Sequence, residues 1–303
     1  LKHTIAKYRW LYQLGLQGPD MFFYNIPILR HRDYRNVGSY MHEHKVNAFF
    51  ECCLRRIGTI RSRQQQEEAI SYLAGFINHY IADSICHPYV YGRIGYPVDA
   101  PTSMHHGMHA HLENELDAIL LWKYKKKKPS EFNQTATICL NGQEIQFISH
   151  FLASCINETY YPITYRNNFQ VTPAMVHRSI WALRFGCRTL SDKNGKKKFG
   201  IAQVESIFVN HPVASAKMVT DSVTDYRSSC NLNHEAWSNP WDPTRVSTAS
   251  FVDLFHETLD KCSRVYALLN SAVTDNMPLD KQDLSPLLAE LGNESYHSGL
   301  PVD

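Results

Sequence analysis

The sequence contains no apolar run long enough to cross a bilayer, because charged residues interrupt each apolar stretch well short of about 18 residues. It also lacks a strong excess of either charge, since the formal net charge is +2 over 303 residues. Bulk attraction to nucleic acid or to an anionic membrane is therefore not indicated. No signal-peptide pattern is present at the start, which reads LKHTIAKYRW without Met. We expect a globular cytoplasmic protein without a transmembrane segment, with secretion of a processed form as the alternative.

Cysteine pairing motifs are also missing. The eight cysteines form no CxxC pair and follow no regular spacing. This pattern favours free thiols in a reducing compartment over a disulfide framework. Nothing in the sequence indicates an oligomeric state.

Strand signals are scarce, and helical periodicity dominates. The clearest strand signal is TICLNGQEIQF at 137–147, where alternating residues surround Asn-Gly and predict a β-hairpin. Apolar residues at helical spacing predict helices elsewhere. The predicted helices are 43–57, 64–86, 111–125, 173–190, 201–228, 247–272 and 283–291. We therefore predict a mainly α-helical single domain over residues 1–303.

Histidine is abundant, with 16 in the chain, and the stretch HYIADSICHP at 79–88 shows the most regular pattern. His79, Asp83 and His87 recur every four residues, so neighbours in this series share a helix face. Each step of four also rotates by roughly 40°, so all three side chains do not converge easily on one ion. A carboxylate has two oxygens, and Asp83 can therefore bridge two metals, with His79 on one and His87 on the other. The alternative is an inert polar helix edge.

A second cluster, HHGMHAHLENELD, contains two i, i+4 pairs of His and Glu. His109 with Glu113 and His111 with Glu115 can each present a metal-binding face near a helix start. We favour His109 and Glu113, followed by Asp117, as the inward-facing set, and we expect His111 and Glu115 on the solvated side.

Two upstream residues complete the candidate ligands. His42 in MHEHK shares helical spacing with the apolar positions Val46, Phe49 and Phe50, so we expect His42 inside and His44 in water. Asp20 follows Gly-Pro and precedes an aromatic run, which fits either an N-cap or a buried ligand.

Four stretches in this order resemble the bacterial zinc-dependent phospholipase C family: GLQGPDMFFY, YMHEHKVNAFF, GFINHYIADSICHPYVY and HAHLENELD. The resemblance covers about residues 5–125 and continues more weakly in LNHEAWSNPWDP. It implies an all-α, multihelical fold of the type shared with fungal single-strand-specific nucleases. The metal-site half would be 1–125 and the helical C-terminal half 126–303, with one short β-hairpin.

The same resemblance implies a ligand set. One zinc would take Asp20, His42, His79 and Asp83, a second would take His87, His109 and Glu113, and a third would share Asp83. The shorter spacing between Asp83 and His87 requires a local adjustment of the helix end before Pro88. The family's third site takes further ligands near the N-terminus that this sequence does not match, so we expect two or three zinc ions.

The resemblance implies hydrolysis of a phosphodiester by metal-activated water, with phospholipid as the favoured substrate. Asp20 would both bind zinc and orient or deprotonate the water. Two alternatives remain open: a nuclease of the same fold, and a non-catalytic metal-binding member without the third site. Iron, manganese or nickel also suit nitrogen and carboxylate ligands.

Overall fold

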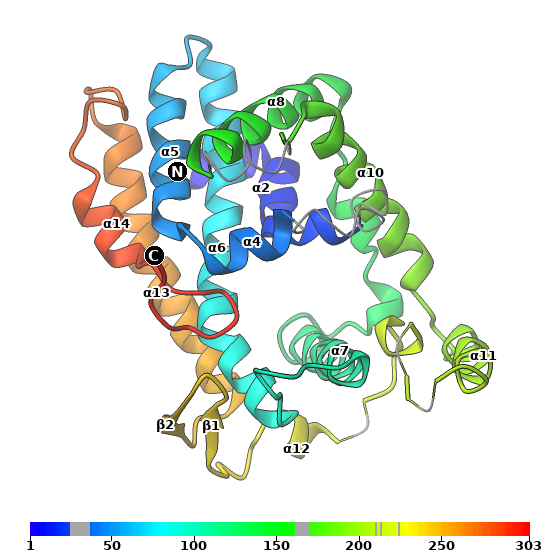
Figure 1. The fold of residues 1–303 in the computed structure, drawn as a ribbon. Coiled ribbons are helices and arrows are strands. Elements are labelled where there is room, and N and C mark those ends of the chain that lie inside the picture. Colours follow the sequence, from blue (N-terminus) through cyan, green and yellow to red (C-terminus); the bar gives the residue numbers. More distant parts are fainter. Residues whose placement is uncertain (25–36, 161–169, 210, 213, 224) are drawn as a thin grey trace. The chain divides into compact units, whose positions relative to one another are not determined.

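Helices make up most of the chain in the computed structural model, which describes residues 1–24, 37–160, 170–209, 211–212, 214–223 and 225–303 (Figure 1). The residues divide into two compact units. Unit 1 comprises Leu1–Ser84, Ala136–Phe185 and Thr258–Asp303, and unit 2 comprises Ile85–Thr135 and Gly186–Glu257. The all-α prediction is confirmed, whereas a single domain over 1–303 stays a prediction.

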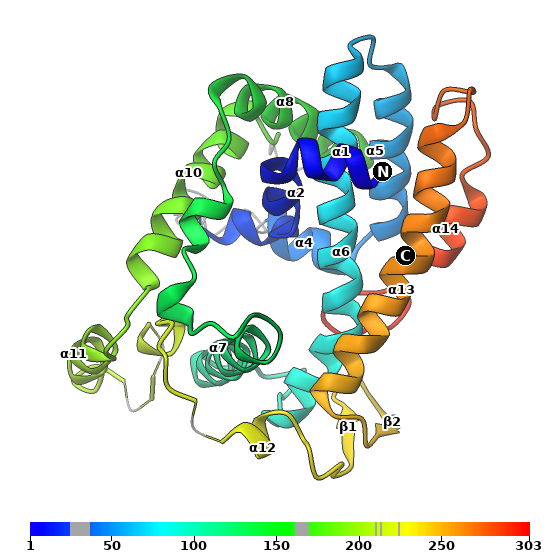
Figure 2. The same cartoon turned by 180° about the vertical axis from the view of Figure 1, so that it is seen from behind.

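Unit 1 is built mainly from helices, and three of them, α6, α10 and α13, are shared with unit 2. Its elements are α1 (Lys2–Lys7), α2 (Arg9–Gly15), the 3₁₀ helix η1 (Gly18–Tyr24), α4 (Val37–Glu43), α5 (Val46–Thr59), the first part of α6 (Arg63–Arg93), α8 (Gly142–Thr159), most of α10 (Pro173–Leu190), most of α13 (Phe251–Thr274) and α14 (Ser285–Leu291). Figures 1 and 2 both show α5 beside the first part of α6 and α14 beside α13.

The core of unit 1 is aromatic, with Phe49 and Phe50 of α5 packed on Phe76 of α6 at ring-centroid distances of 5.2 and 5.9 Å. Two glycines allow α2 to approach α6 closely. A Cβ on Gly15 would lie 2.1 Å from the carbonyl oxygen of Tyr72, and one on Gly75 would lie 2.0 Å from the carbonyl oxygen of Tyr12. This contact fixes α6 directly beside the start of the chain, next to η1.

Unit 2 contains the ends of α6 and α10 and the start of α13, together with other elements. These are α7 (Ser103–Lys125), η2 (Pro129–Glu131), α11 (Lys196–Glu205), η4 (Ser215–Lys217), α12 (Tyr226–Ser229), β1 (Trp237–Asn239) and β2 (Asp242–Ser247), while η3 (Gln134–Thr137) lies at the boundary. A buried cluster joins Tyr89 of α6, Leu116 and Ile119 of α7, and Phe251 and Leu254 of α13. It holds α6 and α7 together at the positions that carry the second set of candidate ligands.

The hairpin predicted at 137–147 is wrong. Asn141 is instead the N-cap of α8: its side chain accepts a hydrogen bond from the backbone of Glu144 at 2.9 Å, and the Glu144 carboxylate accepts one from the Asn141 backbone at 2.8 Å. This reciprocal capping box outweighs the Asn-Gly turn signal. In the described residues the antiparallel hairpin is β1–β2, in the WSNPWDP region.

Most predicted helices are present with shifted ends. The helix predicted at 43–57 is divided, because α4 ends at Glu43 and Lys45 adopts a left-handed φ of 47° before α5 starts. The prediction of one helix over 201–228 is wrong: in the described part of this range, α11 ends at Glu205 and only η4 and α12 follow.

The described chain includes no helix that is both long and apolar enough to cross a membrane. All eight cysteines lie in described residues and are free thiols.

Candidate metal centre

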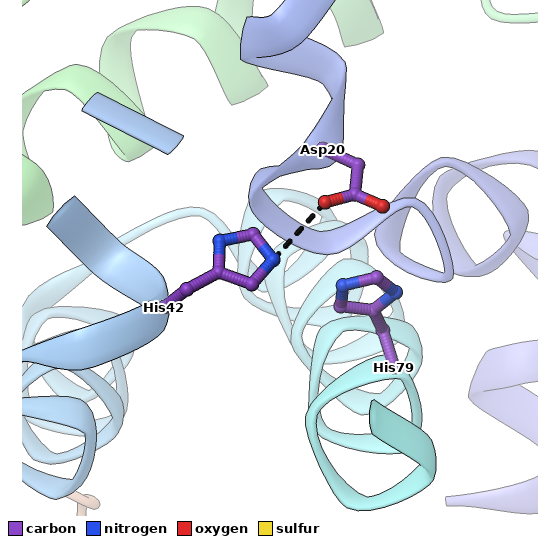
Figure 3. Close-up of side chains that lie close together, drawn as sticks. All are labelled: Asp20, His42 and His79. Carbon is purple, nitrogen blue, oxygen red and sulfur yellow. Dashed lines mark ion pairs between the residues drawn. The ribbon is translucent and has the colours of Figure 1, made fainter. Parts of the chain in front are cut away.

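Three predicted ligands meet in unit 1, and we call them the first ligand group: Asp20, His42 and His79. They come from η1, α4 and α6, and their ligand atoms all lie within 4.8 Å of one another. Figure 3 shows the three side chains turned toward a common point, with Oδ1 of Asp20 3.1 Å from Nε2 of His42. Three separate segments therefore supply nitrogen and carboxylate ligands to one place.

The turn that delivers Asp20 depends on Gly18. This residue has φ of +49°, and a Cβ there would lie only 2.0 Å from Cδ2 of His79. Glycine meets both requirements, because it adopts a left-handed conformation without strain and leaves room for the His79 ring. Asp20 then lies in the first turn of η1, with its side chain 41% exposed, and it does not cap an α-helix.

His42 is almost fully buried, at 1% exposure. Our prediction that it continues the helical face of Val46 and Phe49 is wrong, since the chain breaks between α4 and α5, but the inward position is retained. The Nδ1 atom of His42 lies 2.7 Å from the carbonyl oxygen of Gly38. When Nδ1 carries the proton, its N–H donates a hydrogen bond to that carbonyl, and the lone pair of Nε2 faces Asp20 and can bind a metal.

Burial opposes the charged form of His42, but a hydrogen bond and the charge of Asp20, together with the charge of Asp83, outweigh this effect and raise its pKa. A proton on Nε2 and a metal ion therefore compete for the same place between these side chains. His44, which we expected in water, is partly exposed and lies 3.1 Å from a carboxylate oxygen of Asp303.

Asp83 lies beside the first ligand group, one helical turn after His79 in α6. Its Oδ2 atom is 3.2 Å from Nε2 of His79 and 3.9 Å from Nε2 of His42. Nε2 of His79 is buried and has no hydrogen-bond partner among the described residues. A buried imidazole nitrogen that makes no hydrogen bond, next to two carboxylates and a second imidazole, fits a bound zinc ion.

The second ligand group is His87, His109 and Glu113, all in unit 2. One oxygen of Glu113, Oε1, lies 3.0 Å from Nε2 of His87 and 3.0 Å from Nε2 of His109. Burial opposes the ionisation of Glu113, but the two imidazoles outweigh this effect and lower its pKa. An ionised carboxylate between two imidazole nitrogens also fits zinc, which binds these atom types.

The alternative pair, His111 and Glu115, is arranged differently from our expectation. His111 is exposed, but Glu115 is buried at 6% exposure and accepts a hydrogen bond of 2.6 Å from Ser229. Asp117, expected to face inward, is exposed. The physical reason is that α7 turns the face of Glu115 toward α12 in unit 2, so this carboxylate has a structural partner.

We expected helix α6 to end before Pro88, but it continues to Arg93. Pro88 removes one backbone donor, and the rest of the helix proceeds because Tyr89 and Val90 are anchored in the core of unit 2. Asp83 and His87 thus belong to one helix. The bridging role of Asp83 stays a prediction.

One comparison with known proteins identifies a family for this chain. A family model described as zinc-dependent phospholipase C matches residues 1–164. The chain belongs to the zinc-dependent phospholipase C family. No curated protein and no solved structure matches the chain. All seven predicted ligands of this family member lie inside the matched range, whereas residues 165–303 lie outside it.

Two residues beside the first ligand group carry no signal in the sequence. Tyr296 and His297 follow α14, more than 200 residues from the ligands, and they lie at neither a helical face nor a recognisable motif. Their ring centroids are 4.8 and 4.7 Å from that of His42. Only their placement in the folded chain associates them with the site.

Proposed function

We propose that this chain is a phosphodiester hydrolase of the phospholipase C type, with phospholipid as its substrate. The observation that carries the proposal is the convergence of Asp20, His42 and His79 from three separate segments. The match to the zinc-dependent family supports it further. Zinc is the metal that both the ligand types and the family indicate.

We propose two or three zinc ions for each chain. The first ligand group with Asp83 would hold one ion, and the second ligand group would hold another. Asp83 has two carboxylate oxygens, of which Oδ2 faces His79 and His42, so sharing of this residue with a further ion is chemically reasonable.

Bound zinc ions polarise phosphoryl oxygens and lower the pKa of water to near 7, which supplies a nucleophile at neutral pH. The protein's own contribution includes Asp20. One of its oxygens faces Nε2 of His42, and the side chain is 41% exposed. We propose that Asp20 accepts a hydrogen bond from the attacking water, orients it and takes its proton.

We also propose that the protein works in the cytoplasm. The free state of all eight thiols supports a reducing compartment. Expression as fusions that report on the redox environment or on secretion tests this part separately.

The test combines metal content with activity for the wild type and three variants. Zinc per chain is measured by mass spectrometry, and hydrolysis is measured on phosphatidylcholine in mixed micelles and on single-stranded DNA. Asp83→Asn and Asp20→Asn change the site. Asp260→Asn is the control, because Asp260 is an exposed carboxylate of α13.

We expect at least two zinc ions per chain in the wild type and in the control, and loss of zinc in Asp83→Asn. Phospholipid hydrolysis should fall at least about 100-fold in Asp20→Asn, a typical effect of removing a general base. Cleavage of DNA without cleavage of phospholipid would contradict the substrate. Zinc binding without any hydrolysis would contradict the enzyme assignment, and a wild type without zinc would contradict the whole proposal.

A further inference from the structure

The C-terminal segment after α14, residues 292–303, packs against the first ligand group within unit 1. The backbone N–H of Tyr296 donates a hydrogen bond of 2.9 Å to the carbonyl oxygen of His42. The imidazole ring of His297 lies parallel to that of His42, at a centroid distance of 4.7 Å and an interplanar angle of 8°. The Tyr296 ring contacts the rings of both His42 and His79, at 4.8 and 5.8 Å.

Several bonds hold this segment in place, so it is an ordered part of unit 1. The hydroxyl of Tyr80 donates to Oε2 of Glu294 at 2.6 Å and accepts from the backbone N–H of Glu294 at 3.0 Å. Tyr80 directly follows His79 in α6, so the anchor and the ligand are neighbours. At the far end, the backbone N–H of Lys45 donates to the carbonyl oxygen of Asp303 at 2.9 Å.

The His42 ring is therefore restrained on more than one side. The carbonyl oxygen of Gly38 lies at hydrogen-bond distance from Nδ1 of His42, and the His297 ring stacks on one face of the His42 ring. The Tyr296 ring packs against the His42 ring at an interplanar angle of 56°. Tyr296 is 1% exposed, so it cannot swing away without opening the core. A metal ligand whose ring is held at its binding angle loses less conformational freedom when the metal binds.

We infer that His297 is a positioning residue of the first metal site, acting by stacking on His42 and not by donating a ligand atom. This inference rests on the zinc site of the proposed function. In the described part of the chain, the side chains whose ligand atoms lie within 4.8 Å of one another at this site are Asp20, His42 and His79, and His297 is not among them. The segment lies outside residues 1–164, so the family match does not assign this role.

The test compares two substitutions at the same position. His297→Ala removes the ring, whereas His297→Phe keeps a flat ring for stacking and removes both nitrogens. His150→Ala is the matched control, because His150 is an exposed histidine of α8 in the same unit. All are made in a Glu113→Gln background, which weakens the second ligand group so that the tightest zinc site measured is the first one.

Zinc affinity is measured by competition with a chromophoric chelator, and the unfolding midpoint of each metal-free protein is recorded. We expect His297→Ala to weaken zinc binding about tenfold, the lower end of the effect of removing a residue that orients a metal ligand. His297→Phe and His150→Ala should stay within about threefold of the background protein, a range well below that orienting effect. The metal-free midpoint of His297→Phe should stay at the background value, because the ring packing is retained.

An affinity of His297→Ala equal to the background would overturn the inference. Equal losses in His297→Ala and His297→Phe would also overturn it, because they would show that the imidazole nitrogen itself is needed. If the Glu113→Gln protein with intact His297 binds no zinc, the zinc site of the proposed function fails, which is a separate result from a failure of the stacking role.

Discussion

The close approach of Gly18 to His79 gives the sharpest test of the first ligand group, because it changes no ligand. Gly18→Ala would add a Cβ at 2.0 Å from Cδ2 of His79, where ordinary contact begins at 3.4 Å. The His79 ring or the η1 turn must therefore move by 3.4 − 2.0 = 1.4 Å. Zinc–nitrogen distances are about 2.0–2.1 Å and tolerate changes of roughly 0.2 Å. The required movement is several times this tolerance.

A matched control separates this clash from backbone strain. Gly195 also has a positive φ, +68°, but a Cβ there meets nothing within 4 Å. Gly195→Ala should lose about 1–2 kcal/mol of unfolding free energy, the cost of a left-handed conformation in a residue with a Cβ. Gly18→Ala should lose more, because it adds the clash with His79 to the same backbone cost. Only Gly18→Ala should also lose zinc from the first ligand group.

The assay uses the Glu113→Gln background, chelator competition for zinc affinity, and urea unfolding of the metal-free proteins for stability. We expect zinc affinity to fall at least about tenfold in Gly18→Ala and to stay unchanged in Gly195→Ala, since a displaced ligand typically costs this much. Equal zinc affinities in the two variants, with Gly18→Ala folded, would refute the reasoning that η1 and His79 form one metal site.

Further predictions concern pH, metal removal and folding. In metal-free protein the raised pKa of His42 stabilises the fold below a pH of about 6.5, and this stabilisation is lost as the pH rises through the raised pKa. The unfolding midpoint measured in EDTA should therefore fall from pH 6 to pH 8. A His42→Gln variant that shows the same fall would contradict this prediction. The lowered pKa of Glu113 stabilises the fold above a pH of about 4.3, and this stabilisation is lost as the pH falls through the lowered pKa. The stability of Glu113→Gln should therefore depend less steeply on pH in acid than that of the wild type. An identical acid unfolding profile would contradict the charge interaction of Glu113 with His87 and His109. Zinc added back to EDTA-treated protein should raise the unfolding midpoint in calorimetry at pH 7.5, with a rise that grows with the zinc concentration, and an unchanged midpoint would argue against a folded-state site. Asn141→Ala should lower the unfolding free energy, measured in urea, by about 1 kcal/mol, because it removes the cap of α8. Asn270→Ala, at an exposed position, should have a smaller effect. Equal effects of the two substitutions would show that the cap contributes little.

The helical class and the spacing of the ligands within single helices could be predicted from sequence. The residue interval of four places His79 beside Asp83 and His109 beside Glu113, and it does so in any regular helix, independently of the rest of the fold. The family pattern also required only the order of the motifs. Local geometry and composition were sufficient for these statements.

Sequence could not decide which side of α7 is buried or where the strands lie. Glu115 and Asp117 both lie among the apolar residues of α7, so the sequence alone did not show which carboxylate is buried. The hydrogen bond from Ser229 of unit 2 to Glu115 accounts for the burial of Glu115. The Asn-Gly pair fits a hairpin turn and a helix cap equally well, and the reciprocal bonds of Asn141 and Glu144 selected the helix.

Tertiary structure alone brought Asp20, His42, His79 and His297 together. These residues lie on four segments separated by up to 277 positions, from Asp20 to His297. The sequence by itself determined that the chain is helical and that two of its helices carry ligand pairs, because those properties depend on neighbours within a few turns. The arrangement of η1, α4 and the C-terminal segment around His79 depends on long-range packing, including the missing side chain of Gly18, and no local pattern encodes it.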